Sequence, residues 1–136
     1  MKAAVFSVFV SSQNVRGAEA APLIDRLKKD GFTVEHSPES PLDPRWKDWY
    51  DKRLEEALDR SKAFIFVIDR GWDSSTWMAT EADAALRRRQ NGKLLGFFSY
   101  NPASMVVTSV GMQPYLSRAL AIDISNATKI IRELST

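Results

Sequence analysis

Short apolar runs alternate with segments of helical periodicity along the whole chain. Residues 3–10 and 62–69 are rich in β-branched and aromatic side chains, the composition of strands that are buried on both faces. Shorter runs predict three further strands, at residues 32–36, 93–99 and 119–123. The pattern therefore predicts five strands, none of which is followed directly by another.

Helices are predicted between these strands. Apolar residues recur at helical spacing in four segments, with a shorter helix expected in the loop between residues 101 and 118. Gly31 and Gly92 supply helix stops, while Asp43 and Ser125 are suited to helix starts. The four helices are expected at residues 17–30, from 43 to about 60, from about 75 to 90, and from 125 to the end of the chain.

Strict alternation of strand and helix predicts a parallel sheet with right-handed crossovers and helices on both faces. We expect one α/β domain over residues 1–136, a three-layer sandwich with a five-stranded sheet in the flavodoxin-like order 2-1-3-4-5. Ligands of such sheets bind outside the carboxyl ends of the strands. The loops at residues 11–16, 37–44 and 69–75 are therefore the expected place for a site.

Composition excludes several classes of site. The chain has no cysteine and one histidine, His36, which argues against disulfides, a metal site and a Ser-His triad. A net charge of +2 does not favour nucleic acid, and no apolar run reaches the roughly 18 residues of a membrane helix. P-loop, dinucleotide-binding and nucleophile-elbow motifs are missing, so no resident cofactor is expected. We expect a cytoplasmic protein that binds neither nucleic acid nor membrane.

Glu81 is the residue whose position suggests chemistry. It lies with Trp77 and Arg88 on the flank of the predicted helix 75–90, too far along it to be a cap. Uncharged residues occupy the neighbouring i±3 and i±4 positions, so the carboxyl has no basic partner on its own helix. A carboxyl beside a tryptophan at the mouth of a cleft has a raised pKa. The alternative interpretation is a solvated surface glutamate.

Three segments resemble TIR (Toll/interleukin-1 receptor) domains. Residues Ser75 to Glu81, S-T-W-M-A-T-E, are similar to the family signature S-x-W-C-x-x-E, with Met78 in place of the cysteine. Val8 to Ser12 looks like the family's opening strand, and Trp46 to Asp69 like its second helix and third strand. The family loop R-D-x-x-P-G differs here, because residues 39–44 read E-S-P-L-D-P without glycine.

The resemblance implies an activity. In TIR-family enzymes that consume NAD, the glutamate of this signature is catalytic, which gives Glu81 that role in cleaving the nicotinamide N-glycosidic bond, in signalling or defence. NAD would be a substrate and not a cofactor. Glu81 is expected to face a cleft bounded by Ser11, Trp46 and Trp77. The implied substrate-binding residues are Phe9, Trp46 and Trp77 for ring stacking, with Ser11, Ser12, Arg45 and Ser75 for polar contacts. Core packing is the other interpretation of Phe9 and Trp46.

Two alternatives remain open at the level of sequence. The first is a non-enzymatic TIR-like interaction module that associates with itself or with another TIR-like protein. The second is a nucleoside or nucleotide N-glycosidase or deoxyribosyltransferase. Nucleoside 2-deoxyribosyltransferase-like proteins place a glutamate similarly, in a pattern that ends E-x-G-x-A…G-K-P. Here Asp83 replaces the glycine and Leu94 the proline.

Overall fold

A computed structural model describes residues 6–38, 43–107 and 110–134. Its five strands form one parallel sheet in the order β2-β1-β3-β4-β5, which confirms the predicted fold class. The strands are β1 (Ser7–Ser11), β2 (Thr33–Glu35), β3 (Ser61–Val67), β4 (Gly96–Tyr100) and β5 (Leu120–Ile122). The helices are α1 (Ala20–Lys29), α2 (Arg45–Lys52), α3 (Leu54–Arg60), the 3-10 turn η1 (Trp72–Ser74), α4 (Thr76–Gln90), α5 (Gln113–Leu116) and α6 (Ala127–Glu133).

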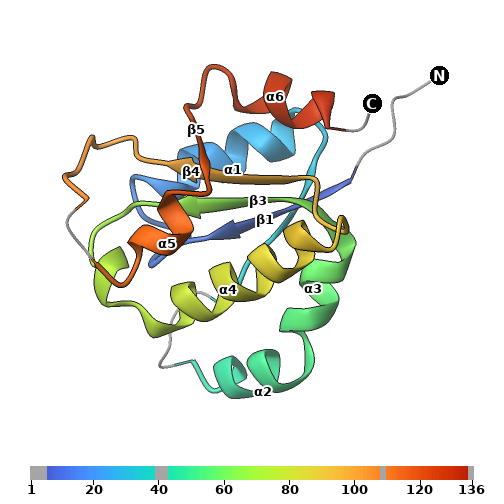
Figure 1. Cartoon of the computed structure of the whole chain (residues 1–136), viewed down its shortest axis with the longest axis vertical. Helices are drawn as coiled ribbons and strands as arrows, with labels where there is room; N and C mark the ends of the chain where they lie inside the picture. Colours follow the sequence, from blue (N-terminus) through green and yellow to red (C-terminus); the bar gives the residue numbers. More distant parts are fainter. Residues whose placement is uncertain (1–5, 39–42, 108–109, 135–136) are drawn as a thin grey trace.

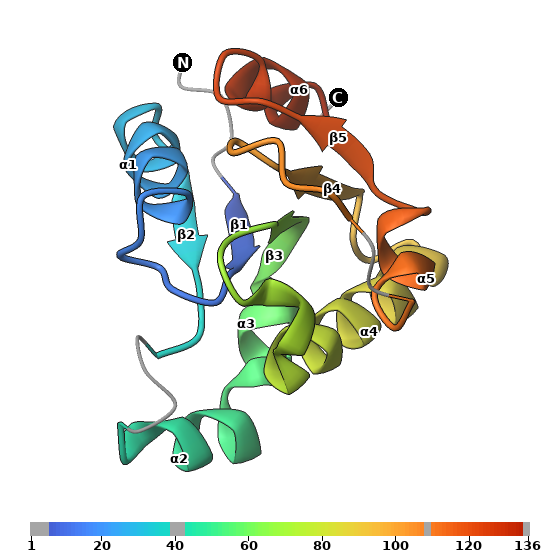
Figure 2. The same ribbon diagram turned by 90° about the vertical axis from the view of Figure 1, so that its left-hand side faces the viewer.

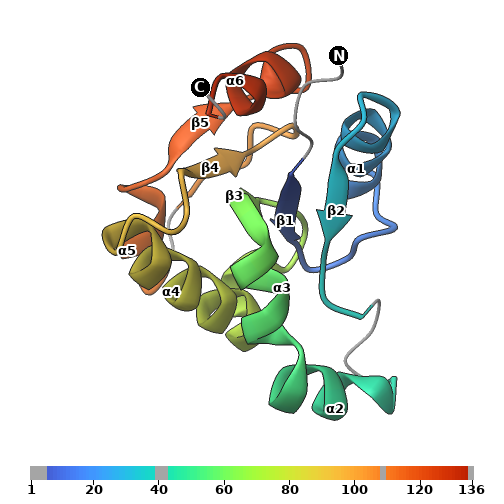
Figure 3. The ribbon, with the colours of Figure 1, turned by 90° about the vertical axis from the view of Figure 1, so that its right-hand side faces the viewer.

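Helices cover both faces of the sheet. Figure 1 shows α1 and α6 on one face and α3 and α4 on the other, so two apolar clusters form, one on each side. The helix α2 is the outermost element of its side, as Figures 2 and 3 show from two directions. Within the described residues, no helix combines the length and apolar character that crossing a membrane requires.

Alternation along β1 decides which of its side chains point toward α4. Successive strand residues point to opposite faces, and Val8 and Val10 join the cluster under α1 and α6. Phe9 joins the cluster under α3 and α4. Ser11, two residues after Phe9 at the carboxyl end of the strand, therefore faces α4. This places one hydroxyl where the sheet meets that helix.

Several boundaries differ from the prediction. The helix expected from residue 43 to about 60 is two helices, α2 and α3, because Arg53 leaves helical geometry at φ −119° and ψ −21°. The break lets the apolar residues of α3 face the sheet while α2 takes another direction. The first strand was expected from residue 3, but residues 1–5 lie outside the described part of the chain. The strand expected from residue 93 begins only at Gly96. At the start of α4, the Ser75 side chain caps the helix by accepting a hydrogen bond from the backbone N–H of Met78.

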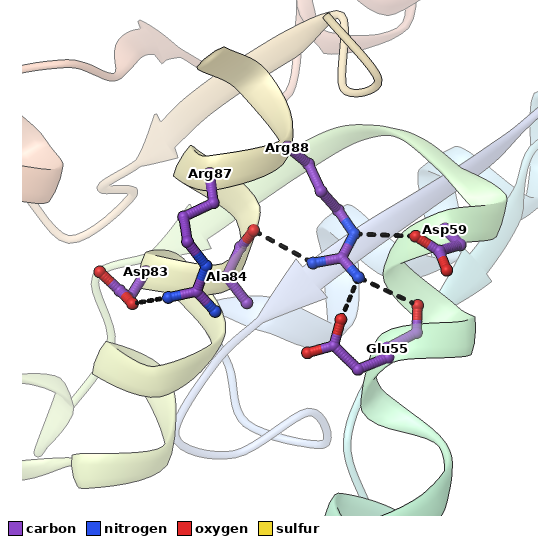
Figure 4. Close-up of polar contacts among 6 residues, drawn as sticks. All are labelled: Glu55, Asp59, Asp83, Ala84, Arg87 and Arg88. Carbon is purple, nitrogen blue, oxygen red and sulfur yellow. Dashed lines mark hydrogen bonds and ion pairs between the residues drawn. The ribbon is translucent and has the colours of Figure 1, made fainter. Parts of the chain in front are cut away.

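Arg88 joins α4 to α3, as Figure 4 shows. Its Nε donates to Asp59 Oδ1 at 3.0 Å, its Nη1 donates to the carbonyl of Ala84 at 3.2 Å, and the guanidinium also pairs with Glu55. The Arg88 side chain is only 12% exposed. Arg87, by contrast, is 60% exposed and pairs with Asp83 on its own helix.

We predict that Arg88→Met lowers the free energy of unfolding by about 1 kcal/mol, because it removes hydrogen bonds between two helices and leaves the acidic partners to water. Arg87→Met makes the same change of charge and is the control, expected to stay within about 0.5 kcal/mol of wild type. Urea unfolding of both variants measures this. An equal decrease in the free energy of unfolding of both variants would show that the contacts of Arg88 with α3 do not stabilise the protein.

Gly96 lies where the start of β4 meets a crowded core. A Cβ at this position would stand 2.6 Å from the ring of Phe98 and 2.7 Å from the side chain of Leu134. We predict that Gly96→Ala destabilises the protein by about 1–3 kcal/mol through overpacking. Gly111→Ala, where a Cβ meets nothing within 4 Å, is the control. Thermal unfolding compares the two, and a Gly96→Ala variant as stable as the control would contradict the prediction.

Candidate functional site

The Glu81 carboxyl is completely buried and is held by hydroxyl groups. Ser11 Oγ, at the end of β1, donates to Glu81 Oε1 at 2.7 Å. Tyr50 OH, on α2, donates to Glu81 Oε2 at 3.2 Å. The hydroxyl of Ser37, which follows β2, also hydrogen-bonds the carboxyl. Three segments that are distant in sequence therefore converge on one side chain of α4.

Burial dominates the electrostatics of this carboxyl. Desolvation raises the pKa of Glu81 from 4.5 to about 8, and the hydrogen bonds from Ser11, Tyr50 and Ser37 oppose this rise. The groups that act on it are thus hydroxyls, and no cation is among them. Burial and the adjacent carboxyl also raise the pKa of Tyr50, which keeps its hydroxyl protonated as a donor.

Tyr50 belongs to a cluster of three aromatic side chains that joins α2 to α4. The rings of Trp46 and Tyr50, one helical turn apart on α2, stack with their centroids 5.1 Å apart. Trp46 meets Trp77 of α4 edge-on at 5.0 Å. Trp46 is buried, and within the described residues its indole N–H has no hydrogen-bond partner. Of the residues expected around Glu81, Ser11 bonds it directly, whereas Trp46 is connected to it through Tyr50, on which it stacks, and Trp77 packs against Trp46.

The expected open cleft is not present. Glu81 has 0% exposed surface, because Tyr50 bonds it from the α2 side and Ser11 from the sheet side. The alternative of a solvated surface glutamate is also wrong. The Glu81 carboxyl is buried inside the protein, so it neither faces an open cleft nor lies in solvent.

The other predicted substrate-binding residues have different environments. Phe9 lies in the core, stacked on Phe64 at 5.6 Å, so core packing is its role here. Ser75 is the N-cap of α4. Ser12 is buried, and its hydroxyl has no hydrogen-bond partner within the described residues. Arg45 is exposed and pairs with Asp43, whose pKa it lowers to about 2.

A cavity of about 370 Å³ adjoins the hydroxyl of Ser37. Ser37 lines this cavity and also bonds Glu81, which itself is not among the lining residues. The lining carries aromatic, cationic and polar groups, from His36, Ser37, Pro38, Arg45, Asp48, Trp49 and Arg53. Residues 39–42 of the loop that departs from the TIR pattern lie outside the described part of the chain.

Asp69 braces the loop after β1. At the end of β3, its buried carboxyl accepts the backbone N–H of Gln13 at 3.0–3.1 Å and that of Asn14 at 3.1 Å. Burial raises the pKa of Asp69 to about 6, against the opposing effect of these bonds. The brace fixes the chain immediately after Ser11 and Ser12.

Tyr50, Ser37 and Asp69 were not predicted as site residues. A signal for Tyr50 was available, because it follows Trp46 by one helical turn and shares its face. Asp69 ends the most apolar strand, at the sheet edge where sites form. Ser37 begins one of the loops where a site was expected, but nothing in the local sequence singles it out from the rest of that loop, because its contact with Glu81 joins distant segments.

Comparison with known proteins agrees with this fold. Residues 8–133 match the TIR domain family. Among solved structures, the TIR domains in the activated Roq1 resistosome that directly recognises the pathogen effector XopQ are similar. They have a TM-score of 0.57 and 17% identity over 96% of this chain and 81% of that one, which shows a shared fold. No curated protein matches the sequence.

Neither match supports the resemblance to nucleoside 2-deoxyribosyltransferases. The family match spans nearly the whole chain, including Ser11, Tyr50 and Glu81. The five-stranded order with α4 carrying the S-x-W-x-x-x-E pattern is consistent with it. This chain belongs to the TIR domain family.

Proposed function

We propose that this protein cleaves the bond between nicotinamide and ribose in NAD, with Glu81 as its catalytic carboxylate. The observation that carries the proposal is the environment of Glu81, a buried carboxyl at the carboxyl end of the central strands that has no ionic partner among the described residues. A structural carboxyl at this depth normally has a cation beside it, whereas a perturbed carboxyl held by hydroxyls is typical of an active site.

The neighbouring cavity supports the choice of substrate. Its aromatic group, Trp49, suits a flat ring, and the cations Arg45 and Arg53 suit phosphate oxygens. Ser37 contacts both this cavity and Glu81, so in this proposal Ser37 must move before a ligand in the cavity reaches the carboxyl. A dinucleotide that presents a cationic ring to Glu81 and a pyrophosphate to the arginines fits this arrangement.

The reaction needs stabilisation of positive charge more than it needs acid. The C1′–N1 bond breaks, and its electron pair goes to the nicotinamide nitrogen, which neutralises the pyridinium. The ribosyl centre becomes oxocarbenium-like, and a carboxylate beside it lowers the energy of that charge. Water then adds to C1′ and gives up one proton, so the products are nicotinamide, ADP-ribose and a proton.

Protonation of Glu81 changes when such a substrate binds. With a pKa of about 8, the carboxyl is mostly neutral at pH 7 in the ligand-free protein. A cationic ring placed against it stabilises the charged form and lowers its pKa. The resting protein therefore keeps a neutral carboxyl under cover, and the substrate itself favours the reactive carboxylate.

Association with a second TIR domain is part of the proposal. The TIR domains similar to this chain belong to an activated resistosome. Exposed apolar residues are available for such contacts, among them Val110 at 85% exposure and Leu120, on the edge strand β5, at 59%. Activity is therefore to be measured over a range of protein concentrations.

We predict that Glu81→Gln lowers the rate of nicotinamide release from NAD by about 100-fold or more, because it removes the stabilising charge and preserves shape. Release is followed by chromatography at several protein concentrations. Asp83→Asn, an exposed carboxyl on the same helix, is the control and is expected to retain the wild-type rate. No release by wild-type protein at any concentration, or equal release by Glu81→Gln, would refute the activity and favour a non-enzymatic interaction module.

A second prediction concerns stability and pH. The folded protein holds the proton of Glu81 up to a pKa of about 8, whereas the unfolded chain releases it near 4.5. The contribution of the protonated Glu81 to the free energy of unfolding is fully present below pH 4.5 and is lost as pH rises through about 8.

Relative to Glu81→Gln, the wild-type free energy of unfolding is therefore expected to fall across this window, by at most about 1.4 kcal/mol per pH unit. Urea unfolding of both proteins at pH 5, 6.5 and 8 measures the difference, in which the contribution of Asp69 cancels. Parallel stability curves would show that Glu81 titrates like an ordinary glutamate.

A further inference from the structure

The helix α2 is attached to the domain through its aromatic residues. Trp46 is its buried residue, while Trp49 and Tyr50 are half-buried and the remaining positions face solvent. Trp49 packs at 6.2 Å from Phe9, and the geometry breaks at Arg53 before α3 begins. Figures 2 and 3 show α2 at the periphery, away from the sheet. Its position therefore depends on a few aromatic contacts.

The phenol of Tyr50 is held in a defined orientation. It stacks on Trp46 with 16° between the planes, and it meets Trp49 nearly perpendicularly, at 81° and 5.1 Å. Its hydroxyl points at Glu81 Oε2. Packing against Trp46 and Trp49 therefore holds the Tyr50 hydroxyl in position to donate to Glu81.

The two oxygens of Glu81 are held by elements of different kinds. Oε1 accepts from Ser11, which belongs to the central strand β1 and is braced by Asp69 just beyond it. Oε2 accepts from Tyr50, on the outermost helix. The shorter bond, 2.7 Å against 3.2 Å, is the one from the sheet. Movement of α2 therefore removes a donor from Oε2 and leaves Oε1 bonded.

We propose that Tyr50 is a positioning residue for Glu81, which couples the docking of α2 to the orientation and protonation of the carboxyl. This rests on the proposed function, in which Glu81 is the reacting group. When α2 is docked, the carboxyl is covered and both of its oxygens accept hydrogen bonds. When α2 moves away, Oε2 loses the hydrogen bond from Tyr50, and the side of Glu81 that α2 had covered becomes exposed. Docking of α2 then controls both access to the carboxyl and its charge.

The surroundings of Glu81 give this coupling a definite direction. In the part of the chain that the structure describes, the groups that hydrogen-bond the carboxyl are Ser11 from β1, Ser37 after β2 and Tyr50 from α2, and Tyr50 is the titratable one among them. Each of these donors stabilises the charged form and lowers the pKa of Glu81. While α2 stays docked, loss of the Tyr50 hydroxyl therefore raises that pKa and favours the neutral carboxyl. Undocking of α2 also readmits water, which relieves the desolvation and acts in the opposite direction.

Tyr50→Phe tests the proposal, because it removes the hydroxyl and keeps the ring between Trp46 and Trp49. The protonated carboxyl is followed by its infrared carbonyl band, assigned by the difference between wild type and Glu81→Gln, through a pH titration. We expect the midpoint in Tyr50→Phe to rise by on the order of one pH unit. Amide hydrogen exchange across residues 45–52 is expected to become faster, because α2 loses one attachment.

Two further variants separate coupling from general loosening. Tyr115→Phe, on α5, is the matched control and is expected to change neither the midpoint nor exchange in α2. Ser11→Ala removes the donor from the rigid strand, so it is expected to raise the midpoint and leave exchange in α2 unchanged. Circular dichroism confirms that each variant is folded.

The outcomes decide between the two proposals. A midpoint in Tyr50→Phe equal to wild type, unchanged exchange in α2, or no carbonyl band of Glu81 that titrates in wild type would each overturn the positioning role. If wild type releases no nicotinamide but the midpoint moves with Tyr50→Phe, the positioning role stands and the NAD-cleaving activity fails. If it does release nicotinamide, the pH profile of the rate shifts in the same direction as the midpoint.

Discussion

The burial of one carboxyl without an opposite charge is the constraint on which this site depends. Taking Glu81 out of water disfavours its charged form, and the fold compensates with hydroxyl donors in place of a cation. Hydroxyls stabilise a carboxylate less than an arginine does, so the balance leaves the pKa near 8. A cation in the same place would hold the carboxyl permanently charged and paired, and would leave it no role toward a cationic substrate.

This arrangement needs elements of different rigidity to meet. Ser11 is fixed by the pairing of β1 with both of its neighbours, and Asp69 holds the chain just after it. Tyr50 stands on a short helix that is separated from α3 at Arg53. Arg88 anchors α3, the helix that follows α2, to α4. Glu81 is therefore held by one donor from the central sheet and one from a peripheral helix.

Much of this was accessible from the chain alone, for reasons that are specific to each feature. The apolar run at residues 62–69 and the alternation of strands with helices dictated a parallel sheet. The uncharged neighbours of Glu81 showed that it has no basic partner on its own helix. The role of Phe9 was ambiguous at the level of sequence, because an aromatic residue in a strand next to a site can pack in the core or stack on a ligand. The structure places it in the core.

The sequence by itself determined the fold class, the helix that carries Glu81 and the strand end that carries Ser11, because these follow from local periodicity and from the rules of parallel sheets. Only the tertiary structure decided that Glu81 is closed and not open, and that Tyr50 and Ser37 complete its surroundings. The reason is that these contacts join residues 31 to 70 positions apart, through the break at Arg53 and the crossover after β2. Contacts between residues so far apart in sequence depend on how whole helices and strands pack, and local sequence patterns do not predict them.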